Sequence, residues 1–192
     1  MKKLLIILVS LIAGCKSAPP IDTLSKQYLY DNSGVSTSEF DRNITIQAIP
    51  INDTLTRGLT LDIFTYYLES KVNKETQSVS HSLVFGIKYH QDWRYYDSLN
   101  FSGGETINSY VIKRDVESCS TNMFTGCTFH EIVSFTILEA ELKEAIKNGG
   151  LKFRINSRFK NIFTIGLFPP NYIEAQLQHV REKQSEASIK NS

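Results

Sequence analysis

The 192-residue sequence lacks several features that would assign a class of protein at once. Its 21 Lys and Arg nearly balance its 20 Asp and Glu, which argues against general nucleic-acid binding because that activity usually requires a basic excess. It contains no GxSxG, HExxH or phosphate-binding glycine motif, and its four histidines have no spacing typical of metal ligands. The sequence therefore predicts no catalytic residue, no metal site and no other cofactor.

No apolar run is long enough to span a bilayer as a helix, which takes about 20 residues. A shorter run lies at the N-terminus, where two lysines precede an uncharged stretch at residues 4–11. This stretch has the length of the hydrophobic region of a signal peptide. Directly after it, residues 11–15 are Leu-Ile-Ala-Gly-Cys, so that two small side chains stand before Cys15.

The order of these features resembles the signal peptide and lipobox of bacterial lipoproteins. The resemblance implies that residues 1–14 are removed and that Cys15 becomes the lipidated N-terminus, anchored because each buried methylene contributes about 0.8 kcal/mol. In enteric-type lipoproteins, an aspartate directly after the lipidated cysteine retains the protein in the inner membrane, and this sequence has Lys16 at that position. The resemblance therefore implies a place in the bacterial envelope, sorted to the outer membrane and facing the periplasm. The alternative is a chance cysteine after an ordinary signal peptide or a short anchor helix.

The other two cysteines, Cys119 and Cys127, form an even pair in a chain that the signal directs to an oxidising compartment. A disulfide is the default interpretation of such a pair. The segment between them contains Ser, Thr, Asn and Gly, which favour turns, so the bond would close a loop between two strands. The alternative is a zinc site that includes His130, but it has no CxxC pair and no evident fourth ligand.

Alternating apolar and polar residues predict strands over much of the chain after residue 40. In each predicted strand, every second residue is expected to face the core. These sets run from Ile44 to Ala48, from Leu59 to Ile63, from Val79 to Tyr89 (continued by Trp93 and Tyr95) and from Val133 to Ile137. Helical spacing predicts one internal helix near 138–148, capped by Thr136 and Glu139, and a C-terminal helix near 171–182. The expected fold is β-rich α+β, an antiparallel sheet or sandwich with these two helices.

The distribution of turn-forming residues predicts the domain organisation. Prolines and a polar Asp-Asn-Ser-Gly sequence break any regular pattern in residues 15–40, which predicts a lipidated flexible tether. Residues 41–182 are expected to form a single globular domain. The chain is expected to fray from Arg181 onward, with residues 183–192 as a polar tail.

The segment from Tyr89 to Asp97 combines aromatic side chains with Asp and Arg, a composition suited to a sugar-binding platform. Its candidate binding residues are Trp93, Arg94 and Tyr96, and peptidoglycan or lipopolysaccharide would suit the predicted location. The alternative is that one parity, including Trp93, packs in the core while Arg94 and Tyr96 face solvent.

A second candidate surface follows from the alternation of apolar and basic residues after position 150. Lys152, Arg154, Arg158 and Lys160 share one parity of a predicted strand. Such a basic stripe is able to bind anionic lipid head groups or phosphates. The alternative is a solvated strand face, or an edge strand protected by its charge.

Together these observations predict a membrane-anchored envelope lipoprotein that is a non-catalytic binding or assembly module. Its expected partners are the membrane, through lipid on Cys15, and another envelope protein or a glycan. The alternatives are a module that binds glycan or anionic lipid, and an envelope hydrolase without a recognisable motif.

Overall fold

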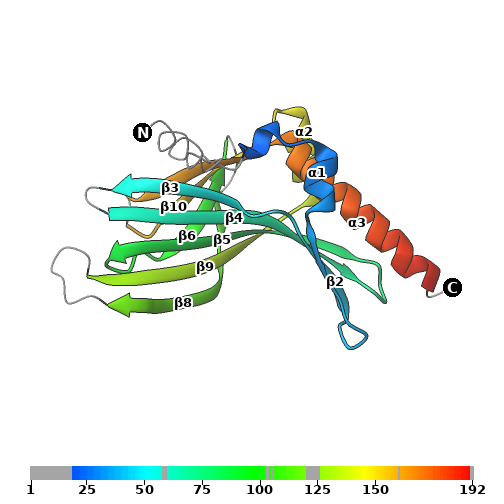
Figure 1. Ribbon diagram of the computed structural model, residues 1–192, viewed down its shortest axis with the longest axis horizontal. Coiled ribbons are helices and arrows are strands. Elements are labelled where there is room, and N and C mark those ends of the chain that lie inside the picture. Colours follow the sequence, from blue (N-terminus) through cyan, green and yellow to red (C-terminus); the bar gives the residue numbers. More distant parts are fainter. Residues whose placement is uncertain are drawn as a thin grey trace, which may run out of the picture.

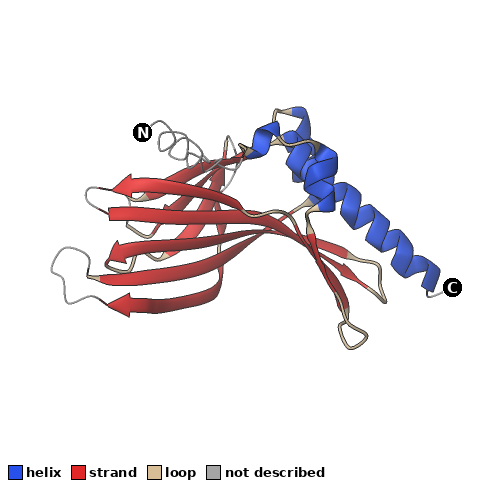
Figure 2. Ribbon diagram, viewed as in Figure 1, coloured by secondary structure: helices blue, strands red, loops and turns tan. Residues whose placement is uncertain are grey.

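A computed structural model describes residues 19–57, 60–102, 104, 106–119, 126–159 and 161–190. The fold is β-rich α+β, as predicted, with two antiparallel sheets, a short internal helix and a long C-terminal helix. Figure 1 shows the order of the elements, and Figure 2 shows the helices gathered at one side of the sheets. Within the described residues, no helix has the length and apolar character needed to cross a membrane.

The larger sheet has seven strands in the order β1-β2-β4-β5-β9-β8, with β3 paired to β4 as well. These strands are β1 (Gly34–Ser36), β2 (Asn43–Gln47), β3 (Ile51–Arg57), β4 (Thr60–Asn73), β5 (Val79–Gln91), β8 (Tyr110–Cys119) and β9 (Cys127–Ile137). Strand β4 is long enough to pair with β3 along its first half and with β2 along its second half. Strands β3 and β2 therefore lie end to end along the same edge of β4.

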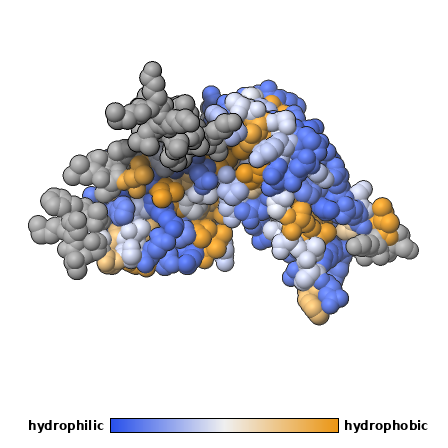
Figure 3. Space-filling view, viewed as in Figure 1, coloured by the Kyte–Doolittle hydropathy of each residue, from blue (hydrophilic) through white to orange (hydrophobic). Residues whose placement is uncertain are grey.

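The smaller sheet has four strands in the order β11-β10-β6-β7. They are β6 (Tyr96–Phe101), β7 (Thr106–Asn108), β10 (Leu151–Ser157) and β11 (Phe163–Phe168). The helical elements are η1 (Ile21–Thr23), α1 (Lys26–Asp31), α2 (Glu139–Lys147) and α3 (Pro170–Lys190). On the face shown in Figure 3, hydrophobic side chains form several separate patches within a mainly hydrophilic surface.

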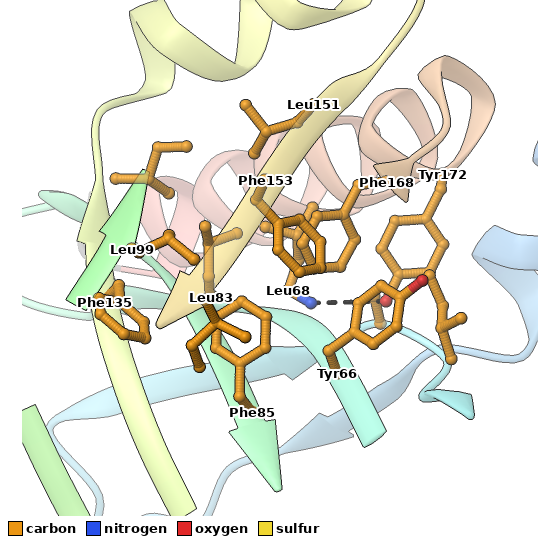
Figure 4. Packing of buried hydrophobic residues seen from close by; sticks show 14 of the residues in the cluster. Tyr66, Leu68, Leu83, Phe85, Leu99, Phe135, Leu151, Phe153, Phe168 and Tyr172 are labelled. Atoms are coloured by element: carbon orange, nitrogen blue, oxygen red, sulfur yellow. Dashed lines mark hydrogen bonds between the residues drawn. The ribbon is translucent and has the colours of Figure 1, made fainter. Parts of the chain in front are cut away.

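An aromatic core fills the space between the two sheets. The ring centroid of Phe153 on β10 lies 5.1 Å from those of Tyr66 and Phe85, and 5.3 Å from that of Phe168. Figure 4 shows these rings converging from both sheets. Helix α3 closes one end of the core, where the Tyr172 hydroxyl donates to a backbone carbonyl at 2.7 Å and accepts from the Leu68 N–H at 3.4 Å.

The predicted parity of β4 is wrong. Leu61 and Ile63 are 50% and 44% exposed, whereas Phe64, Tyr66 and Leu68 are buried. Both parities of this strand carry large apolar side chains, and the aromatic set makes the better contacts with the core rings. Leu59 lies outside the described residues.

Helix α2 forms where the sequence predicts a helix, but its cap differs. The first helical residue is Glu139, and the Glu141 carboxylate accepts the Leu138 N–H at 2.8 Å, so the predicted pairing of Thr136 with Glu139 is wrong. The glycines after the helix have positive φ angles, 81° at Gly149 and 114° at Gly150. A Cβ atom at Gly150 would lie 2.6 Å from the Phe168 carbonyl oxygen, so this turn requires glycine.

Helix α3 is longer than predicted. It continues to Lys190, so the expectation that residues 183–192 fray is wrong up to that residue. Val180 and Ala187 are buried in a cluster with Ile44, Ile46 and Val72 on β2 and β4. These contacts stabilise the last helical turns of α3, although the other positions in those turns are polar. The helix therefore persists because of its tertiary packing and not because of its composition.

The segment predicted to be a flexible tether contains ordered structure from residue 19 onward. Leu29 on α1 is buried, and the Tyr30 ring lies 4.5 Å from the His179 ring on α3. The Asn171 side chain at the start of α3 donates to the Leu24 carbonyl at 2.5 Å. This part of the segment therefore packs on the domain, while Cys15 and its neighbours lie outside the described residues.

Candidate functional site

The segment from Tyr89 to Asp97 crosses one end of the space between the sheets. Gln91 and Tyr95 both have positive φ angles, 87° and 52°, so the regular alternation of β5 ends before β6 begins. Because of this break, Arg94 and Tyr96 are buried, and the expectation that they face solvent is wrong. Trp93 is half-buried and reaches the surface.

Arg94 forms an ion pair inside the protein with a residue that the sequence analysis missed. Its guanidinium donates to both carboxylate oxygens of Asp62, which is 2% exposed, with one Nη–Oδ distance of 3.1 Å. The guanidinium also lies 4.4 Å above the Tyr89 ring. Burial is the largest single influence and acts to lower the pKa of Arg94, but the interactions with Asp62 and Tyr96 together outweigh it and raise the pKa above its ordinary value.

Glu131 on β9 is the second buried carboxylate of this network. It accepts hydrogen bonds from the Tyr89 hydroxyl, from the Tyr95 N–H at 3.0 Å and from Arg114 Nε at 2.6 Å. Burial, with the bond to Glu131, raises the pKa of the Tyr89 phenol well above its ordinary value. Each carboxylate of the network, Asp62 and Glu131, therefore has an arginine partner, as buried charges must.

The network fixes the backbone on either side of Arg94. The Arg94 N–H donates to the Tyr89 hydroxyl at 3.0 Å, and the Arg94 carbonyl accepts from Ser157 Oγ at 2.6 Å. The Tyr95 carbonyl accepts from the backbone N–H of Arg158 at 3.0 Å. These bonds join the turn to the end of β10 and fix the backbone that follows Trp93.

A hollow of about 330 Å³ lies over this turn. It is lined by His90, Gln91, Asp92, Trp93, Arg94, Phe159 and Ile162. The lining combines an apolar wall, to which the indole and the exposed Phe159 contribute, with polar side chains along β5. The indole packs edge-on against the Phe129 ring at 4.6 Å, which leaves part of its surface open.

The predicted disulfide is present beside this hollow. Cys119 and Cys127 join the ends of β8 and β9 through an S–S bond of 2.06 Å. Cys127 also pairs with Gln91 in the register of β5 and β9. The bond therefore fixes the strand that borders the lining residue Gln91. Among the described side chains, no group of three potential ligands is placed to hold a metal ion.

The structure does not place the four residues of the predicted basic stripe together on one surface. Lys152 and Arg154 are exposed on the outer face of β10. Arg158 forms an exposed ion pair with Asp97, with a distance of 3.3 Å between Nε and Oδ2. Lys160 lies outside the described residues. Two of the four cations thus share one face of the smaller sheet, and a third is neutralised near the hollow.

The sequence analysis also missed a serine, a histidine and a glutamate whose arrangement resembles that of a nucleophile, base and acid. Ser70 Oγ lies 2.8 Å from His81 Nδ1, and His81 Nε2 lies 3.7 Å from a Glu139 carboxylate oxygen. Ser70 also accepts from the Gln176 side chain of α3 at 2.9 Å. All but Glu139 are buried, and burial lowers the pKa of His81. The group therefore joins the larger sheet to α3 and offers no surface to a substrate.

Of the two missed carboxylates, Glu131 carried a signal under the predicted strand parities, whereas Asp62 carries one only when the parity of β4 is corrected. Asp62 shares the strand parity of Phe64, and Glu131 shares that of Val133. An acidic residue on the apolar face of a strand predicts a buried partner. Comparison with known proteins finds no matching family model, no matching curated protein and no matching solved structure.

Proposed function

We propose that the protein is a lipid-anchored lipoprotein of the bacterial envelope whose folded part is a non-catalytic binding module, with the hollow beside Trp93 as a glycan site. The observation that carries the glycan site is the composition of this hollow. A half-buried indole and an exposed phenyl ring stand beside polar side chains, on a turn that buried ion pairs hold in place.

The lining has the chemistry that a sugar ring requires. One face of a pyranose is apolar and packs on an aromatic ring, while its hydroxyls need both donors and acceptors. Gln91 supplies a donor and an acceptor, Asp92 supplies acceptors, and His90 supplies either according to its tautomer. The volume of about 330 Å³ lies at the small end of ligand pockets, which measure about 300–1,000 Å³.

Lipid anchoring is supported by the N-terminal sequence, in which the charged pair, the apolar run, the small residues and Cys15 follow in order. The disulfide supports an oxidising compartment, since such bonds persist mainly outside the cytosol. A periplasmic location would bring the hollow within reach of peptidoglycan.

Intact mass spectrometry of the protein purified from membranes tests the anchor. We expect the mass of a chain beginning at Cys15 plus that of attached acyl groups, because cleavage before this residue is coupled to lipidation in lipoproteins. Replacement of Cys15 with serine removes the thiol and provides the control, which should lack the added mass. A chain that keeps residues 1–14, or one without acyl groups, would contradict the proposal.

A fluorescence titration with peptidoglycan fragments tests the glycan site, because Trp93 is the only tryptophan in the chain. We expect a saturable shift of the indole emission. The Phe159→Ala variant should bind about tenfold more weakly, equivalent to about 1.4 kcal/mol, because it removes one apolar wall.

The matched control for this titration is Phe163→Ala. Phe163 is also an exposed phenylalanine, but it lies on the outer face of β11 and does not line the hollow. Its replacement should leave the affinity unchanged. A flat titration, or an equal loss in both variants, would remove the glycan assignment.

A further inference from the structure

The outer face of the smaller sheet carries cations that the rest of the described structure leaves unneutralised. Lys152 and Arg154 project from this face, and neither has an ion pair with any described residue. In the described parts of these four strands the acidic residue is Asp97, and it is paired with Arg158. The described part of this face therefore carries net positive charge, although the whole chain is nearly neutral.

Uncharged polar groups lie beside these cations. The Asn156 side chain donates to Asn100 Oδ1 at 2.7 Å, and the Asn100 side chain donates to Thr106 Oγ1 at 2.6 Å. A hollow of about 460 Å³ opens on this face, and Asn100, Lys152 and Arg154 contribute polar groups to its lining. Its donors suit phosphate oxygens.

Exposed apolar side chains occupy the other side of the same face. Ile165, which is 63% exposed, and Phe163 both project outward from β11. The Arg154 guanidinium lies 5.7 Å from the Phe163 ring. Cationic and apolar groups side by side are the composition of surfaces that bind at the boundary between head groups and acyl chains.

The packing of the N-terminal segment places this face close to the proposed anchor. Asn171, in the first turn of α3, binds Leu24 beside η1, and α3 begins directly after β11. Only five residues separate Cys15 from Ile21, the first residue of η1. Even fully extended, they span about 20 Å.

We infer that the outer face of the smaller sheet rests on the anionic lipid head groups of the bilayer that holds the anchor. The short linker gives the face a high local concentration at that surface, and Lys152 and Arg154 supply the attraction. This inference relies on the proposed lipid anchor but not on the proposed glycan site.

Depth-dependent quenching tests the inference with the full-length lipoprotein in vesicles. The vesicles contain equal parts of phosphatidylglycerol and phosphatidylcholine, with or without bromine on the acyl chains. In a Trp93→Phe background, Ile165→Trp places a single indole on the proposed face. Its matched control is Ile63→Trp, since Ile63 is an exposed isoleucine on the outer face of the larger sheet.

Brominated lipid should reduce the fluorescence of the indole at position 165 and leave that at position 63 unchanged. When Lys152→Glu and Arg154→Glu are added, brominated lipid should no longer quench the indole at position 165. Salt at 1 M should weaken the quenching at position 165 in the unreversed protein, because the Debye length falls from about 10 Å at 0.1 M to about 3 Å.

Flotation of the vesicles separates the two ways in which the inference can fail. A chain that does not float with the vesicles overturns the lipid anchor and the inference with it. A chain that floats while both indoles are quenched equally, or while neither is quenched, overturns the inference alone. Quenching at position 165 in pure phosphatidylcholine, unchanged by the two charge reversals, also overturns it.

Discussion

Replacement of Arg94 with alanine is expected to lower the free energy of unfolding by about 3–5 kcal/mol. The guanidinium is the bidentate partner of Asp62, and both side chains are buried. Removal of the cation leaves the Asp62 carboxylate in a low-dielectric site without its main compensating charge. Urea unfolding followed by circular dichroism measures the effect.

Arg158→Ala provides the matched control, because it breaks an arginine–aspartate pair at the surface. Arg158 is 64% exposed and Asp97 is 36% exposed. Solvent screens such a pair, and we expect a loss of about 0–1 kcal/mol. If both variants lose the same small amount, the Arg94 pair is not the stabilising element that its burial indicates.

The second large effect is expected at the centre of the aromatic core. Phe153 packs against Tyr66, Phe85 and Phe168, with ring centroids 5.1–5.3 Å away. Phe153→Ala removes these contacts and leaves a cavity between the sheets. We expect a loss of about 3–5 kcal/mol in the free energy of unfolding, measured in urea.

A glycine opposite this ring makes the prediction sharper. Gly166 pairs with Phe153 across β10 and β11, and a Cβ atom there would lie 2.3 Å from Phe153 Cζ. Gly166→Ala should therefore cost about 1–3 kcal/mol in the natural chain. In the Phe153→Ala background the clash disappears, and the same change should cost much less. An equal cost in both backgrounds would show that ring packing is not the reason for this glycine.

Much of the fold was predictable because its elements are amphipathic over several turns or repeats. Helix α2 and the start of α3 follow from helical spacing, and Leu142, Ile173 and Leu177 are buried as that spacing predicts. The length of α3 was not predictable from its polar C-terminal half. Its last turns depend on contacts with β2, which is more than a hundred residues away along the chain.

The site was harder to predict because it depends on breaks in periodicity. Nothing in the local sequence marks Gln91 and Tyr95 as positions of positive φ, since neither is glycine. These two residues reverse the parity, so that Arg94 points inward and Trp93 reaches the surface. The partner of Arg94 lies 32 residues away, and single-sequence patterns do not give strand pairing. The disulfide was predictable because its two cysteines form an even pair with turn-forming residues between them.

The contact between α1 and α3 joins two segments that lie far apart in the sequence. The Tyr30 hydroxyl donates to the Glu182 carboxylate across 152 positions of sequence, and Leu29 is buried in the same region. Contacts of such high sequence separation form late, because loop closure must come before they stabilise anything. During synthesis, α1 emerges long before α3 and must wait for it. Helix α1 therefore completes its packing only after α3 has been synthesised, and until then it stays accessible to chaperones.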